Sequence, residues 1–170
     1  DAPHIVMAPA TIEECFHVMI TARRLAETFR TLVMVLTDAN LATGVTPWPK
    51  PTLDEAWQAA PLDLAPVREG QKAYDWNRET GLSERIIPGR PGGMFTLTGL
   101  SHDDRSKVAY SSDIHQHSSA MRSRKMAVLA SLLKPPAVHG AESGDLLVIG
   151  WGSTKGAIEA AVNRARAEGL

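Results

Sequence analysis

Residues 4–44 read HIVMAPATIEECFHVMITARRLAETFRTLVMVLTDANLATG, and this stretch decides the fold. His4–Ala8 is a short apolar run without polar alternation, which predicts a strand covered on both faces. Leu32–Leu36 is a second run of the same kind. Between them, apolar residues recur at three- and four-residue steps, which predicts a helix with one apolar stripe: Cys15, Val18, Met19, Ala22, Leu25, Ala26 and Phe29. Two such strands joined by one helix predict a right-handed parallel crossover and an α/β domain.

Two polar positions mark the ends of these elements. The Thr11 hydroxyl is placed to accept from the amide of Glu14, and the Glu14 carboxylate to reach back to the Thr11 amide, as in a capping box. Asp38 follows the second strand, at the edge where α/β proteins place ligands. An aspartate there also caps the turn that follows, and the sequence leaves both roles open.

Composition bounds the class of protein. The chain has 170 residues, of which 44% are hydrophobic and 22% charged, as in ordinary globular domains. A net charge of −1 argues against nucleic acid as the main partner. No apolar run approaches the ~20 residues needed to span a membrane, and no signal peptide is visible. The single Cys15 is expected to be a buried small hydrophobe in a reducing, cytoplasmic setting.

The middle of the chain is predicted to be irregular. Prolines and glycines between residues 45 and 95 break any long helix or central strand, although Thr52–Ala60 is compatible with a short helix. Four aromatic residues fall in this region: Trp48, Trp57, Tyr74 and Trp76. They indicate packing, either within the chain or against a partner, and both interpretations stay open. Gly92–Gly99 is expected to form a short strand with a tight turn, and Ser111–Leu133 a helix that Pro135 and Pro136 end.

A second strand-helix unit closes the sequence. Leu146–Ile149 is predicted to be a strand, and the residues after Thr154 a helix with alanine, valine and isoleucine on one face. A lone strand and helix cannot bury both faces of the strand. We therefore expect the chain to be a segment of a longer polypeptide that folds poorly alone.

The turn of this unit, Gly150–Gly156, sits where a phosphate loop would. Gly152, Ser153 and Thr154 are therefore weak candidates for an anion site. The third glycine comes one position later than in the dinucleotide fingerprint, and Ser153 or Thr154 as a helix N-cap explains the same residues without a ligand.

A metal or hydrolytic site is not predicted. His115 and His117, two residues apart, point about 200° apart on a helix and cannot share a metal there. With His102, which precedes Asp103 and Asp104, they are expected to be surface or interface histidines. No serine-hydrolase elbow and no acid–base pair is found, so no catalytic residue is assigned.

Taken in order, several segments resemble the alpha subunit of 2-oxoacid:ferredoxin oxidoreductases, especially the 2-oxoglutarate type. The resemblance is collinear over nearly the whole chain, and its segments are His4–Phe16, Val33–Asp38, Gly81–Gly89, Met94–Asp104, Arg124–Lys125 and Val148–Thr154. Met94–Asp104 matches the family's Phe-Thr-x-(Thr or Ser)-Gly-x-x-His segment. The sequence departs from the pattern at Ser101 and Asp104, where glutamate is common, and at Lys107, near a frequent glycine.

The resemblance implies thiamine diphosphate chemistry: decarboxylation of a 2-oxoacid, transfer of the acyl group to coenzyme A, and passage of single electrons through an iron–sulfur cluster to ferredoxin. In this family the alpha subunit contributes the pyrimidine side, and the beta subunit binds the diphosphate, Mg²⁺ and the cluster. The motifs that contact cofactor and substrate lie upstream of the equivalent of Asp1. The resemblance therefore assigns no catalytic or metal-binding residue to this segment, which is expected to be inactive alone.

Three parts are then expected. Residues 1–44 would be the C-terminal half of a pyrimidine-binding domain, and residues 45–140 an extended connection with a helix near 111–133. Residues 141–170 would begin a transketolase C-terminal-like domain. The alternative hypothesis is a non-catalytic nucleotide- or anion-binding α/β module that uses Gly150–Thr154.

Overall fold

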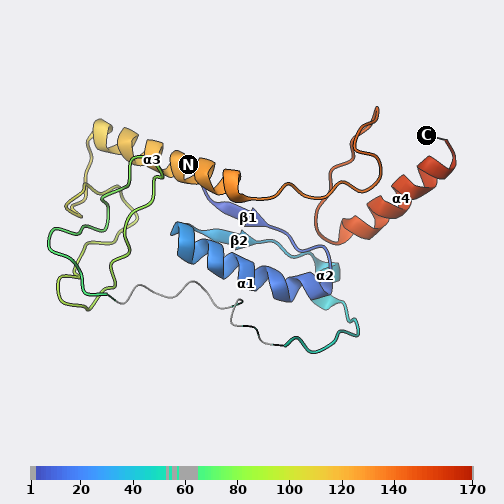
Figure 1. The fold of residues 1–170 in the computed structure, drawn as a ribbon, viewed down its shortest axis with the longest axis horizontal. Coiled ribbons are helices and arrows are strands. Elements are labelled where there is room, and N and C mark those ends of the chain that lie inside the picture. Colours follow the sequence, from blue (N-terminus) through green and yellow to red (C-terminus); the bar gives the residue numbers. More distant parts are fainter. Residues whose placement is uncertain (1–2, 53, 55–56, 58–64, 170) are drawn as a thin grey trace. The chain divides into compact units, whose positions relative to one another are not determined.

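The computed structural model describes residues 3–52, 54, 57 and 65–169. They divide into two compact units (Figure 1). The unit that comprises Ile5–Ala59 and Lys134–Leu170 is called the sheet unit here. The unit that comprises Asp1–His4 and Ala60–Leu133 is called the loop–helix unit. None of the helices in the described ranges combines the length and the hydropathy that crossing a membrane requires.

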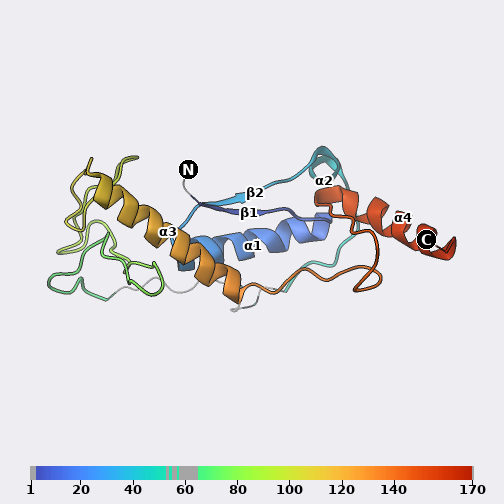
Figure 2. The same cartoon turned by 90° about the horizontal axis from the view of Figure 1, so that it is seen from above.

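The sheet unit is built on a parallel pair of strands, as predicted. β1 (Ile5–Met7) and β2 (Val33–Val35) pair in parallel, with Ile5 opposite Val33 and Met7 opposite Val35. α1 (Ile12–Phe29) connects them and covers one face of the pair, as Figure 2 shows. α2 (Ala39–Thr43) follows β2. The core of this unit contains Ile5, Ala22, Phe29 and Leu41, and Cys15, on the predicted stripe, is half-buried.

The start of α1 follows the predicted cap with one difference. The amide of Glu14 donates to the Thr11 hydroxyl oxygen at 3.1 Å. The Glu14 carboxylate accepts from the amide of Ala10 at 2.7 Å, not from that of Thr11. The prediction of the reciprocal bond is therefore wrong by one residue, because the amide within reach of the Glu14 carboxylate is that of Ala10.

Replacing Thr11 by alanine removes the acceptor for one of the unpaired amides of the first helical turn. We expect the free energy of unfolding of the sheet unit to fall by about 1 kcal/mol. Thermal unfolding followed by circular dichroism measures this change. Thr11→Ser keeps the hydroxyl and should stay close to the wild type; equal losses in both variants would contradict the capping role.

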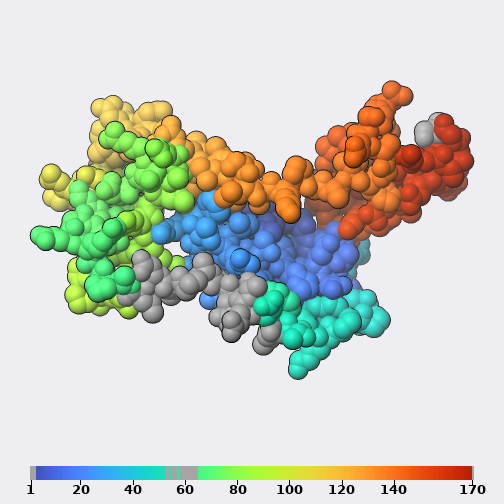
Figure 3. Space-filling model, in the orientation of Figure 1, coloured from blue at the N-terminus to red at the C-terminus, as the bar shows by residue number. Residues whose placement is uncertain are grey.

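The C-terminal part of the sheet unit contains the 3₁₀ turn η2 (Gly152–Thr154) and α4 (Lys155–Ala167). The helix was predicted, but the strand Leu146–Ile149 is wrong: this segment forms no strand, and its side chains are between 50% and 84% exposed. Figure 3 shows residues 134–150 as a narrow, projecting band of atoms. A strand exists only where a neighbour completes its hydrogen bonds, and within the described residues this segment pairs with none.

Thr154 occupies the N-cap position of α4, which the sequence left open as an alternative to an anion site. Thr154 makes no capping bond through its side chain. Its hydroxyl instead donates to the carbonyl of Trp151 at 2.6 Å. The hydroxyl of Ser153 is engaged with Asn40 at 3.3 Å.

The loop–helix unit contains α3 (Ser112–Leu132), which confirms the predicted helix. Met121, Leu129 and Ser118 are its buried residues. The predicted strand in Gly92–Gly99 is wrong, because this segment is irregular and only isolated bridges occur in the described part of the unit, at Trp76–Ser83 and His102–Val108. The predicted helix Thr52–Ala60 lies mostly outside the described residues. Only its positions 52, 54 and 57 are described.

The aromatic residues of the connection pack within the chain. In the sheet unit, Trp48 and Trp57 lie 5.2 and 5.9 Å from the ring of Phe16 on α1, between ring centroids. In the loop–helix unit, Tyr74 stacks on His102 at 4.6 Å, and Trp76 meets His117 edge-on at 5.7 Å. These aromatic residues therefore pin the irregular segments to the unit in which they lie.

The turn after His102 holds a residue in an unfavourable backbone conformation. Ser106 has a φ of +63°, in the left-handed region that side chains with a Cβ disfavour. The turn is closed by a bond from the Ser106 amide to the Asp103 carbonyl at 3.1 Å. The family that the sequence resembles often has a glycine near Lys107. The positive φ of Ser106, one residue earlier, gives a physical reason for a glycine in this turn.

Ser106→Gly should therefore raise the free energy of unfolding of the loop–helix unit by about 1 kcal/mol, since glycine adopts this φ without strain. Urea denaturation of the full-length protein gives the difference. Ser101→Gly, in the same segment but with an ordinary φ, should lower stability by about 0.5–1 kcal/mol. A loss of stability in both variants would show that Ser106 is not strained.

Candidate functional site

An open crevice lies at the carboxyl edge of the two-stranded sheet. Its volume is about 420 Å³, and it is lined by the first turn of α1, by α2, by residues 46–48 and by Ser153. β1 leads into α1 and β2 into α2 at this edge. The carboxyl ends of parallel strands are where α/β proteins bind ligands, so this crevice is the candidate site of the described residues.

Asp38 stands beside this crevice and performs two tasks. One of its carboxylate oxygens, Oδ1, accepts from the amide of Leu41 at 3.0 Å and caps α2. The other, Oδ2, accepts from the amide of Ser153 at 2.8 Å. These bonds lower the pKa of the Asp38 carboxyl below its usual 3.8, and the bond from Ser153 has the larger effect. The capping role that the sequence left open is therefore present.

The same carboxylate occupies the turn that the sequence marks as an anion candidate. Gly152 is buried, has a φ of +64°, and a Cβ built on it would come within 2.7 Å of Asp38 Oδ2. Only glycine fits a site with both constraints. The amide of Ser153 already has an anionic partner from the chain itself, so an external anion has to displace Asp38. The assignment of Gly152, Ser153 and Thr154 to a bound anion stays a prediction.

Other charged groups around the crevice are exposed. Lys155 Nζ lies 3.8 Å from Glu14 Oε1, and both side chains are about half exposed. An ion pair of this kind adds little stability in water. Glu13, in the first turn of α1, lines the crevice and is exposed. Glu13 is therefore the carboxylate that lines the crevice, and Asp38 lies beside it, bonded to the lining residues Leu41 and Ser153.

The predicted surface cluster around His102 is only partly at the surface. His102 is 4% exposed, so the surface prediction is wrong for it. Its Nε2 lies 3.2 Å from the Thr98 hydroxyl, and its ring stacks on Tyr74 with the two planes inclined by 6°. His115 and His117 are exposed on α3, as predicted.

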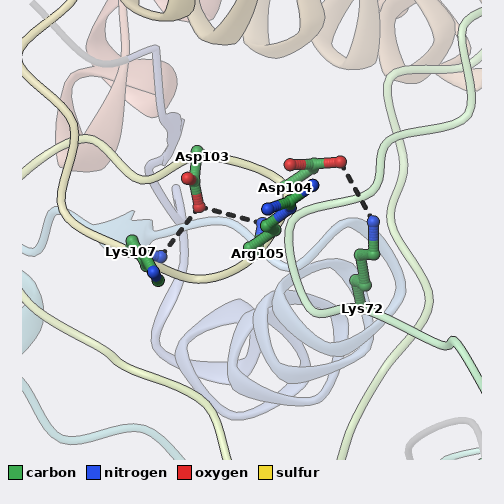
Figure 4. Close-up of polar contacts among 5 residues, drawn as sticks. All are labelled: Lys72, Asp103, Asp104, Arg105 and Lys107. Atoms are coloured by element: carbon green, nitrogen blue, oxygen red, sulfur yellow. Dashed lines mark hydrogen bonds and ion pairs between the residues drawn. The ribbon is translucent and has the colours of Figure 1, made fainter.

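The two aspartates that follow His102 are both engaged, as Figure 4 shows. Asp103 Oδ1 accepts from the amides of Arg105 and Lys107 at 2.9 and 2.8 Å and fixes the turn. Asp104 Oδ2 pairs with Lys72 Nζ at 3.0 Å, and this hydrogen bond lowers the pKa of Asp104. Both carboxylates thus serve the loop structure.

With this geometry established, comparison with known proteins settles the family. Residues 1–123 match the family described as pyruvate flavodoxin/ferredoxin oxidoreductase, thiamine diphosphate-binding. The chain belongs to this family. The resemblance drawn from its motifs, and the α/β fold class, are confirmed.

Individual members of this oxidoreductase family are similar to the chain along almost its whole length. The 2-oxoglutarate oxidoreductase subunit KorA of Mycobacterium tuberculosis is 31% identical over 99% of the chain. The alpha subunit of 2-oxoacid:ferredoxin oxidoreductase 2 of Aeropyrum pernix is 28% identical over 100% of it. A solved 2-oxoglutarate:ferredoxin oxidoreductase of Magnetococcus marinus, with 2-oxoglutarate, coenzyme A and succinyl-CoA bound, matches 99% of the chain with a TM-score of 0.80 and 29% identity.

The chain spans about a quarter of these relatives. It covers 26% of the first, 27% of the second and 29% of the solved chain. The matches therefore cover nearly all of this chain but only part of each relative.

Thiamine diphosphate, which the description of the family names, sets a requirement on its site. The diphosphate of that cofactor requires Mg²⁺ held by oxygen ligands, and the described ranges contain no group of three histidine, cysteine, aspartate or glutamate side chains able to hold a metal. Of the carboxylates near the crevice, Glu14 accepts from Ala10 and Asp38 from Leu41 and Ser153. These two carboxylates therefore serve the local structure.

Proposed function

We propose that this chain is part of the alpha subunit of a 2-oxoacid:ferredoxin oxidoreductase, with 2-oxoglutarate as the oxoacid. The reaction decarboxylates the oxoacid, transfers the acyl group to coenzyme A and passes the electrons to ferredoxin. The observation that carries the proposal is the agreement of fold and sequence over 99% of the chain with a solved enzyme that holds 2-oxoglutarate, coenzyme A and succinyl-CoA.

The domain organisation is part of this proposal. Residues 1–44 are the C-terminal half of a pyrimidine-binding domain, 45–140 an extended connection, and 141–170 the start of a transketolase C-terminal-like domain. The parallel β1–α1–β2 arrangement supports the first part. The long α3 within an otherwise irregular segment supports the second, and η2 followed by α4 supports the third.

The cofactors and partners form part of the proposal. The assembled enzyme uses thiamine diphosphate with Mg²⁺ and an iron–sulfur cluster, which the beta subunit chiefly binds, and it delivers electrons to ferredoxin in the cytoplasm. The described Cys15 is a free thiol, as a reducing compartment allows.

The alternative function, an anion-binding module without catalysis, has less support. It relied on Gly150–Thr154 as a phosphate loop, and the Ser153 amide of that loop is bonded to Asp38.

The test is co-expression of the full-length alpha subunit with its beta subunit under anaerobic conditions. Reduction of a low-potential dye is then measured with coenzyme A and either 2-oxoglutarate or pyruvate. We expect dye reduction that requires coenzyme A and is faster with 2-oxoglutarate. Faster reduction with pyruvate would overturn the substrate, and no reduction with any 2-oxoacid, despite bound thiamine diphosphate, would overturn the proposed function.

A further inference from the structure

The attachment of α4 within the sheet unit is unusually polar. No residue of α4 is buried. The helix packs chiefly on the segment that precedes it: His139 lies 2.9 Å from Asn163 Oδ1, and a Cβ on Gly140 would meet the side chains of Val162 and Arg166. Apolar burial therefore does little to hold this helix and residues 139–150 to the strands.

Polar contacts at one turn provide the connection instead. Ser153 donates its amide to Asp38 Oδ2 at 2.8 Å, and its hydroxyl accepts from Asn40 Nδ2 at 3.3 Å. Lys155 adds the exposed ion pair with Glu14 at 3.8 Å. The Asp38 bond is the shortest of these contacts and is made by a charged acceptor, which makes it the strongest.

The same turn requires glycine beside the Asp38 carboxylate. Gly152 has a positive φ of +64° and lies against Asp38 Oδ2 without room for a Cβ. The residues on each side of it belong to different parts: Trp151 ends the exposed segment, and Ser153 and Thr154 lead into α4. Asp38 therefore lies against the one turn that joins the exposed segment to α4.

We propose that Asp38 is a carboxylate latch: its bond to the Ser153 amide seats the Gly152–Thr154 turn, and with it α4 and residues 139–150, on the β1–α1–β2 core, and its release frees them from that core. The latch stands on this geometry alone. If the proposed domain organisation holds, it joins the pyrimidine-binding part to the start of the transketolase C-terminal-like part.

The latch requires the ionised carboxylate. Each Asp38 oxygen takes one amide, so a side chain with a single acceptor oxygen cannot hold both Leu41 and Ser153. At the ends of the packed helices that adjoin this turn, the other charged groups are Glu13 and Glu14 on α1 and Lys155 on α4, while α2 and η2 carry none. The remaining charged residues of the two long helices lie at least one turn further along: Arg23, Arg24, Glu27, Glu159, Arg164 and Arg166. Because its folded-state pKa lies below 3.8, the latch is complete above that pH and is lost as the pH falls through the lowered value.

Hydrogen exchange measured by mass spectrometry on the full-length protein tests the proposal. In Asp38→Asn, we expect the amides of residues 150–155 to exchange about tenfold faster, while those in the middle of α1 keep their wild-type rates. Asp145→Asn, which changes an exposed carboxylate in the preceding segment, is the matched control and should change nothing. Wild-type exchange at residues 150–155 in Asp38→Asn would overturn the latch.

Two further variants separate the latch from the capping of α2. Asp38→Ser retains a good N-cap, but its shorter hydroxyl reaches only the α2 amide, so residues 150–155 should still exchange faster. Gly152→Ala forces a Cβ against Asp38 and should have the same effect; combined with Asp38→Asn it should add little. Full protection in Asp38→Ser would reduce Asp38 to a helix cap. Hydrogen exchange is measured without enzymatic turnover. A negative result for the latch therefore leaves the proposed enzymatic activity untouched, and the reverse also holds.

Discussion

Alanine at Gly81 is expected to detach the irregular loops from α3. Gly81 is buried with a φ of +70°, and a Cβ there would lie 2.2 Å from the carbonyl oxygen of Met121 and 2.8 Å from the amide nitrogen of Lys125. Both atoms belong to the backbone of α3, which cannot move without breaking the helix. We expect the free energy of unfolding of the loop–helix unit to fall by about 3 kcal/mol or more, from steric overlap and left-handed strain together.

Gly70 provides the matched control. It has a similar φ of +78°, but nothing lies within 4 Å of the Cβ position. Gly70→Ala therefore carries the backbone strain alone, about 1 kcal/mol. Urea denaturation followed by circular dichroism, with limited proteolysis of residues 65–110, compares the two. Equal losses would show that the contact with α3 is not what restricts position 81 to glycine.

The second large effect is expected at Phe29, the last residue of α1. Its side chain is 4% exposed, and truncation to alanine leaves a cavity in the small core beneath the strands. The expected loss is about 3–4 kcal/mol in the free energy of unfolding of the sheet unit. Because this core contains few other buried apolar residues, little can move in to fill the gap.

Arg23→Ala, at an exposed position of the same helix, should change the free energy of unfolding by no more than about 0.5 kcal/mol. Chemical denaturation of the full-length protein measures both variants. A Phe29→Ala loss below about 1 kcal/mol would mean that the sheet unit does not depend on this core.

The elements that the sequence could predict are those whose signals are local. The apolar runs at His4–Ala8 and Leu32–Leu36, with the stripe between them, specify two strands and a helix, and the structure has them in parallel register. The periodic segment from Ser111 to Leu133 specifies α3 in the same way. In each case the residues that carry the signal lie within one or two turns of one another.

The failures concern partners that lie far away in the sequence. Leu146–Ile149 has the composition of a buried strand, but composition does not provide the neighbour that a strand needs, and the segment is exposed. His102 precedes two aspartates and looks like a surface residue. Its burial depends on Tyr74, 28 positions earlier, whose ring covers it.

The Asp38–Ser153 bond joins residues 115 positions apart and leaves no periodic trace in the sequence. A signal was nonetheless present. An aspartate at the carboxyl end of a strand and a Gly-Ser-Thr turn before a helix are complementary, one an anion and the other a set of free amides. Pairing the two within the chain, instead of seeking an external anion, would have found the contact.

The irregular loop–helix unit has a consequence for synthesis on the ribosome. β1, α1 and β2 need only the first 35 residues to meet, and such short-range structure forms quickly. The loops that carry Gly81 and Ile86 instead pack in a unit whose buried helix residues are Met121 and Leu129. Because synthesis proceeds from the N-terminal side, we expect these loops to lack their packing partner, and to be accessible to proteases and chaperones, until α3 has followed them.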